Sequence, residues 1–84
     1  MRAADLVRFL GESAEQNRRA ALSVAEAHRA FATWSGRDVT RTAFGLAAKE
    51  SGLEIVVPGG EWFILGWRLR DSALGLLAAP EVVR

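Results

Sequence analysis

The sequence predicts an α+β fold of three helices and a two-stranded antiparallel hairpin, and three observations predict it. Apolar residues recur at helical spacing between residues 24 and 34, and they alternate at strand spacing between residues 63 and 69. Pro58-Gly59-Gly60 separates two strand-like segments and suits a tight hairpin turn. Because 84 residues leave room for one core, we expect a single domain over residues 1–84.

The first helix is predicted over residues 3–11. Leu6, Val7 and Leu10 fall at helical spacing, and Phe9 widens the apolar face that they form. Gly11 is expected to end this helix. Residues 12–21 are polar in the middle, at Asn17-Arg18-Arg19, and are predicted to be a connector.

The second helix is predicted from Ser23 to Trp34. Ser23 and Glu26 fit a capping box, in which the serine hydroxyl accepts from the amide three residues later. The buried face is expected to carry the apolar residues that repeat along this helix, with His28 beside them. We expect His28 to be partly buried with one hydrogen bond, since no cysteine or second histidine completes a metal site.

The third helix is predicted over residues 41–51, after a short turn that contains Gly36. Thr40 is the expected N-cap, and Val39 can pack on Phe44 as a hydrophobic staple. Gly52 is expected to stop the helix. Phe44 lies on the predicted buried face of this helix.

Two strands are predicted to follow, over residues 53–57 and 61–70. Strict alternation would place Leu65, Trp67 and Leu69 on one face of the second strand, and Ile64 on the other. The expected core includes five of the residues that these periodicities bury: Phe31, Trp34, Phe44, Leu53 and Leu65.

The tail, residues 71–84, is predicted to contain a short helix with Leu74, Leu76, Leu77 and Ala78 before Pro80. Its leucines either close the core, which spans about residues 5–70, or form an apolar patch for a partner.

A helix, a short turn, a second helix and a hairpin, in this order, are typical of a winged helix-turn-helix, which usually presents its second helix to the major groove of DNA. The charge distribution is uneven although the net charge is only +1. Residues 29–49 carry four basic residues and one acid, a local charge of +3, whereas residues 50–66 carry three acids and no base. The predicted recognition helix is therefore positive and the predicted wing is negative.

The candidate DNA-binding residues lie on and before the predicted recognition helix. The face opposite Phe44 carries four of them: Arg41, Thr42, Gly45 and Lys49. Arg37, in the turn between the helices, is expected to contact phosphate. Trp62, beside the hairpin turn, is a candidate wing contact, because an open indole can stack on bases.

Several functional classes find no support in the sequence. No nucleophile and base stand at a recognisable spacing, so we expect no enzyme, no small-molecule substrate and no cofactor. The absence of cysteine excludes disulfides and thiolate metal sites, and we expect a cytoplasmic protein. No apolar run approaches the length that crosses a bilayer, so we expect no membrane segment.

The middle of the chain resembles the C-terminal winged-helix domain of phage- and plasmid-encoded primase–helicases of the poxvirus type. The resemblance rests on five short elements over roughly residues 5–70: Val7-Arg8-Phe9-Leu10, Phe31-Ala32-Thr33-Trp34, Phe44-Gly45, Gly52-Leu53 and Phe63-Ile64-Leu65-Gly66. It implies a domain of phage or mobile-element origin that binds DNA in replication, with a helicase or primase domain as a partner.

Two functions follow from these expectations. The first is a DNA-binding winged helix whose binding to duplex DNA is weak and salt-sensitive, because only about three or four cations can contact phosphate. The second is a protein-interaction module, such as a phage-encoded inhibitor or adaptor, that uses the same fold without binding DNA. The low net charge, the acidic wing and the apolar tail favour the second.

Overall fold

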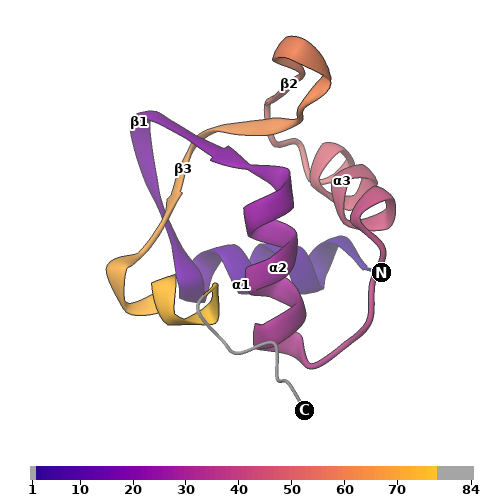
Figure 1. Cartoon of the computed structure of the whole chain (residues 1–84), viewed down its shortest axis with the longest axis vertical. Coiled ribbons are helices and arrows are strands. Elements are labelled where there is room, and N and C mark those ends of the chain that lie inside the picture. The colour runs from indigo at the N-terminus through magenta and orange to yellow at the C-terminus, as the bar shows by residue number, and fades with distance from the viewer. Residues whose placement is uncertain (1, 78–84) are drawn as a thin grey trace.

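The first strand follows the first helix, two helices come next, and the other two strands complete the sheet (Figure 1). The computed structural model describes residues 2–77. Its elements are, in order, α1 (Ala3–Ser13), β1 (Ala14–Ser23), α2 (Val24–Ser35), α3 (Arg41–Glu50), β2 (Ile55–Val56), the 3-10 helix η1 (Pro58–Gly60), β3 (Phe63–Leu69) and the 3-10 helix η2 (Asp71–Leu76). The predicted α+β class is confirmed.

The sheet has three antiparallel strands in the order β1–β3–β2. The predicted hairpin is present as β2 and β3, but the predicted number of two strands is wrong because a third strand joins them. The additional strand is β1, in the region predicted to be a connector. Ala14 pairs with Leu69 at one end of β1, and Ser23 pairs with Phe63 at the other. The middle of β1 is polar and has no strand periodicity of its own, and β1 is held in the sheet by the pairs that its two ends make with β3.

The hairpin strand β2 is shorter than predicted. Only Ile55 and Val56 pair with β3, opposite Ile64 and Phe63. The turn between them uses Gly59 and Gly60, whose φ angles of 63° and 86° are left-handed and suit glycine. The chain therefore reverses tightly at this point, as the sequence predicts.

The ends of α2 and α3 are set by local side chains. Ser23 Oγ accepts from the amide of Glu26 at 3.3 Å, and Thr40 Oγ1 accepts from the amide of Ala43 at 3.1 Å. Gly36 ends α2 in the left-handed conformation, with φ of 70°. These caps confirm the predicted helix starts to within one residue.

The core is centred on three phenylalanines from three helices. Phe9, Phe31 and Phe44 are all fully buried, and their ring centroids lie 5.4 to 6.5 Å apart. Aromatic rings at such distances attract each other beyond the area they bury. The predicted core positions of Phe31 and Phe44 are confirmed, while Trp34 and Leu53 pack on the core as half-buried residues.

Two predicted core residues are misplaced. Val7 is 57% exposed, and the buried face of α1 is formed by Leu6, Phe9 and Leu10. On β3 the buried residue is Ile64 and not Leu65. Gly66, with φ of 85°, interrupts the regular strand, so the inward face changes from Ile64 before it to Leu69 after it.

The segment after β3 packs back on the helices, which supports core closure. Ala73 in η2 is buried, and Leu76 and Leu77 pack against the core. Arg29 Nη2 donates to the carbonyl oxygen of Leu77 at 3.0 Å. Leu74 stays 46% exposed, and Ala78, the last residue named for the predicted tail helix, lies outside the described residues.

A polar contact joins the edge of the aromatic core to α1. The Trp34 indole Nε1 donates to Glu12 Oε1 at 3.1 Å, and Arg8 Nε donates to Glu12 Oε2 at 3.2 Å. The Trp34 contact first, and then Arg8, lower the pKa of Glu12 below its usual value. Between residues 2 and 77, no helix combines the length and apolarity that a bilayer span requires.

Candidate nucleic-acid interface

Helix α3 has one buried and one exposed face. Phe44, Ala47 and Ala48 are buried against the other helices. The opposite face exposes Arg41, Thr42, Leu46 and Lys49. Three of the predicted site residues, Arg41, Thr42 and Lys49, are therefore at the surface of one helix.

A groove runs between α3 and the turn that joins β2 to β3. It has a volume of about 480 Å³, and we call it the α3 groove. Its lining residues come from the start of α2, from α3 and from the turn: Val24, Ala25, Arg41, Thr42, Gly45, Leu46, Gly60, Glu61 and Trp62. Three residues predicted as one helix face, Arg41, Thr42 and Gly45, thus share a groove with Trp62, which was predicted separately as a contact.

Gly45 is not part of the exposed face, contrary to the prediction, because the Trp62 indole covers it. A Cβ atom at Gly45 would lie 3.3 Å from Cε3 and from Cζ3 of Trp62, which is closer than ordinary contact. The amide of Val24 donates to the Trp62 carbonyl oxygen at 3.0 Å. Trp62 therefore sits between α2 and α3 and fixes the start of β3 against both.

Lys49 contacts the Trp62 indole from the exposed side of α3. Its Nζ lies 5.6 Å from the centroid of the Trp62 ring, within the range of a cation–π interaction. Arg41, Gly45 and Lys49 are spaced four residues apart along α3, so they form one row on the helix. The two cations flank the site where Trp62 covers Gly45.

We expect Gly45→Leu to destabilise the protein by about 1–3 kcal/mol, since the new side chain must displace Trp62. Gly11→Leu is the matched control, because Gly11 is also helical and has no atom within 4 Å of its Cβ position. Chemical denaturation followed by circular dichroism gives both free energies of unfolding. Equal stabilities for the two variants would show that the contact between Gly45 and Trp62 is loose.

Arg37 lies apart from this row. Its Nη2 pairs with Asp5 Oδ2 at 3.0 Å, which joins the turn between α2 and α3 to α1. The side chain of Arg37 is 54% exposed, so the pair is a surface contact of small energetic value. The structure therefore gives Arg37 an intramolecular partner in place of the predicted phosphate.

Four other arginines within residues 2–77 also have partners, namely Arg8, Arg29, Arg68 and Arg70. Arg8 pairs with Glu12, whereas Arg29 and Arg70 donate to backbone carbonyls. Arg68 pairs with Glu15 and with Asp71, and these two carboxylates raise the pKa of Arg68, Glu15 having the larger effect. Within residues 2–77, neither Arg41 nor Lys49 pairs with a carboxylate.

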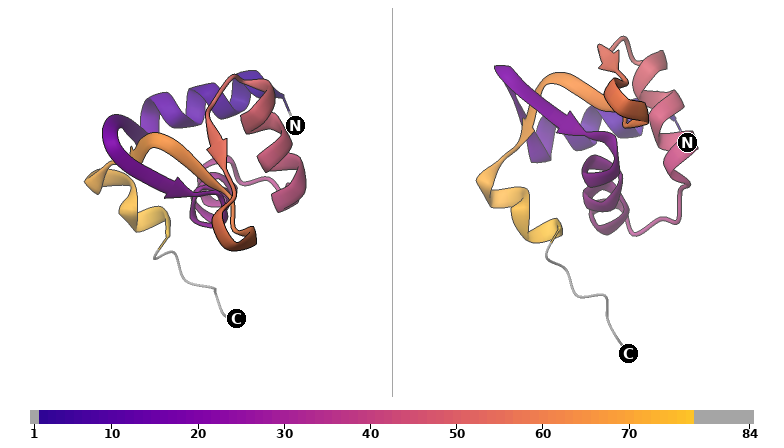
Figure 2. Two further views of the ribbon diagram at one scale, coloured as in Figure 1. Left: turned by 90° about the horizontal axis from the view of Figure 1, so that it is seen from above. Right: turned by 45° about the horizontal axis from the view of Figure 1, so that its top comes forward.

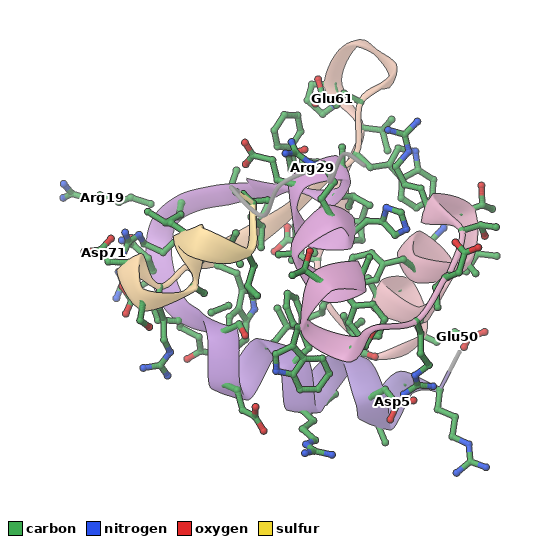
Figure 3. The ribbon with its side chains drawn as sticks, turned by 60° about the horizontal axis from the view of Figure 1, so that its bottom comes forward. Asp5, Arg19, Arg29, Glu50, Glu61 and Asp71 are labelled. Atoms are coloured by element: carbon green, nitrogen blue, oxygen red, sulfur yellow. The ribbon has the colours of Figure 1, made fainter. Side chains whose placement is uncertain are left out.

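The turn between β2 and β3 is acidic, as the sequence predicts. Glu61 follows the η1 turn, at the rim of the α3 groove (Figure 3). It is exposed, and residues 50–66 contain no basic residue to offset its charge. An anion that enters the α3 groove therefore meets Arg41 on one wall and a carboxylate on the other.

His28 contacts the protein backbone and the aromatic core. The Val39 carbonyl can only accept a hydrogen bond, so the Nε2 atom of His28 donates to it. The ring also lies edge-on to Phe44, with centroids 5.9 Å apart. In the described part of the chain, no three histidine, cysteine or acidic side chains gather as metal ligands would.

Comparison with known protein families, with curated proteins and with solved structures gives no match.

Proposed function

We propose that this chain is a winged helix-turn-helix that binds duplex DNA without catalysis, with α3 in the major groove. The order α1–β1–α2–α3–β2–β3 and the sheet order β1–β3–β2 support the fold assignment. In this proposal the turn from Val57 to Glu61 is the wing.

The observation that carries the proposal is the pair of cations on the exposed row of α3. Arg41 and Lys49 lie about two turns apart, and neither pairs with a carboxylate within residues 2–77. An α-helix fits the major groove of B-DNA, where such side chains reach the phosphates on either side.

Two uncharged residues of α3 supply groups for reading bases. Thr42 is exposed and carries a hydroxyl that can donate or accept, and Leu46 is 51% exposed. An exposed apolar side chain on a recognition helix suits contact with the methyl group of thymine. Arg41 and Lys49 position the helix in this proposal, and Thr42 and Leu46 contribute base contacts.

The proposed binding is weak and salt-sensitive, because few phosphates are neutralised and because Glu61 opposes them. No metal, cofactor or catalytic group enters the proposal. From the sequence resemblance, we also propose that the protein is cytoplasmic and of phage or mobile-element origin. In this proposal it acts in replication together with a primase–helicase.

We expect Glu61→Lys to raise the affinity for duplex DNA by about tenfold at low salt, since it replaces a repelled carboxylate with a phosphate-binding cation. Fluorescence anisotropy with a labelled random duplex, titrated at several salt concentrations, measures the change. Glu26→Lys is the matched control, because Glu26 is an exposed residue of α2 outside the α3 groove. A wild-type chain and a Glu61→Lys variant that both fail to bind the duplex at low salt would reject duplex DNA as the ligand.

The alternative is a protein-interaction module that uses the same groove. The apolar residues Val24, Leu46 and Trp62 line the groove beside Glu61, and this mixture also suits a protein partner that carries an apolar and a basic side chain. If neither the wild-type chain nor the Glu61→Lys variant binds the duplex in the experiment above, this alternative is favoured.

A further inference from the structure

The pairing between β1 and β3 is interrupted in the middle of the sheet. The register runs from Ala14 opposite Leu69 to Gln16 opposite Trp67, and it resumes with Ala21 opposite Leu65. Residues 17–20 therefore stand opposite Gly66 alone, and they bend outward from the sheet. The left-handed Gly66, with φ of 85°, allows β3 to follow this break.

The bend is basic and uncompensated. Arg18 and Arg19 are both exposed, and within residues 2–77 neither forms an ion pair with a carboxylate. The nearest acid along the strand, Glu15, pairs with Arg68. Figure 3 shows Arg19 extending away from the body of the protein. The Asn17 side chain accepts from the amide of Arg19 at 3.0 Å, which shapes the bend.

A hollow of about 490 Å³ lies beside this bend. We call it the β1–β3 hollow, and it is lined by Gln16, Asn17, Arg18, Leu65, Gly66 and Trp67. It contains one arginine, two amide side chains, an indole and a leucine, and it contains no carboxylate. Leu65 and Trp67 are both half-buried in this lining, and Trp67 also packs against the core, so only part of its indole faces the hollow.

We infer that the β1–β3 hollow binds single-stranded nucleic acid, with Arg18 and Arg19 on the phosphates and a base against Trp67. Cations along a strand path combined with an aromatic surface are the general means of binding single strands. The amides of Gln16 and Asn17 supply donors and acceptors of the kind that base edges require. The bases of a duplex are stacked inside the helix and do not reach such a hollow.

This site is separate from the α3 groove. In both views of Figure 2 the bend of β1 and helix α3 lie on opposite sides of the molecule. The two linings share no residue. The inference therefore stands apart from the proposed duplex binding, and each can fail without the other.

The test uses the full chain with a labelled oligothymidylate and an abasic strand of the same length and charge, measured by anisotropy at low salt. We expect Arg18→Ala/Arg19→Ala to weaken oligothymidylate binding about tenfold or more, and to reduce the salt slope by about 1.4, since each single-strand phosphate contact contributes about 0.7. The abasic strand should bind about tenfold more weakly than the oligothymidylate to the unmodified chain, because base stacking is lost.

Three controls keep the result specific. Arg2→Ala/Arg8→Ala removes the same charge from α1 and should leave the affinity unchanged. Arg18→Lys/Arg19→Lys retains the charge, so its salt slope should equal that of the unmodified chain. Arg41→Ala/Lys49→Ala should not alter oligothymidylate binding, whatever it does to duplex binding.

Failure has clear forms. No binding of oligothymidylate by the unmodified chain would overturn the inference, as would equal losses in the Arg18/Arg19 and Arg2/Arg8 variants. Equal affinities for the abasic and base-bearing strands would also overturn it, because the hollow would then hold no base. Circular dichroism confirms that each variant is folded, as expected for changes at exposed positions.

Discussion

Phe44→Ala should destabilise the protein by about 3–5 kcal/mol, the usual cost of removing a large aromatic side chain from a core. Phe44 is fully buried, and its ring contacts those of Phe9, Phe31 and His28 at centroid distances of 5.4 to 6.5 Å. For a chain of this length, total stability is on the order of 4–12 kcal/mol. The substitution should therefore remove a large part of it.

Urea denaturation followed by circular dichroism measures this loss as a lower transition midpoint. Val7→Ala is the control, because Val7 is a 57% exposed apolar residue and its truncation should change stability by no more than about 0.5 kcal/mol. A Phe44→Ala midpoint equal to that of Val7→Ala would contradict the position of Phe44 in the core.

Arg41→Ala/Lys49→Ala should weaken duplex binding by about tenfold or more at low salt. If each cation contacts one phosphate, the slope of log affinity against log salt should fall by about 1.8, because each contact to B-DNA contributes about 0.9. A weak binder with few cationic contacts would lose most of its measurable affinity.

Two comparisons separate phosphate contact from other effects of these substitutions. Arg41→Lys/Lys49→Arg keeps both charges and should keep the salt slope, although Lys49 also contacts the Trp62 ring. Arg2→Ala/Arg8→Ala removes the same charge at α1 and should have little effect. Unchanged duplex affinity in the Arg41/Lys49 alanine variant would reject the exposed face of α3 as the DNA surface.

The helices could be predicted from the sequence because their signals are local. Ser23, Thr40 and Gly36 act on backbone groups within a few residues, and the helical periodicity identifies Phe31 and Phe44 as core residues. The same periodicity assigned Arg41, Thr42 and Lys49 to the exposed face of α3, where the structure places them.

The features that sequence reasoning missed depend on contacts between distant segments. The two ends of β1 belong to the sheet because β3 pairs with them, and nothing in the polar middle of β1 indicates a strand. The helical spacing predicted Gly45 to be an exposed site residue, yet the Trp62 indole covers it. The pairing of Arg37 with Asp5 joins residues 32 positions apart and has no local signal.

The basic bend of β1 lies in the segment that was predicted to be a connector. Arg18 and Arg19 are adjacent basic residues with an asparagine before them, and this local composition was the available signal. Their opposition to Gly66 and their place beside Trp67 follow only from the register of β1 and β3.

The strand order also governs when the sheet can form. Within residues 2–77, β3 is the last strand along the chain but the middle strand of the sheet, and Ala14 pairs with Leu69, 55 residues later. During synthesis, β1 and β2 therefore stay unpaired until β3 leaves the ribosome, while α2 and α3 can already form. Contacts between such distant residues slow folding, because the intervening chain must be ordered before the pairing stabilises it. The rate of folding should accordingly be limited by the closure of β1 on β3.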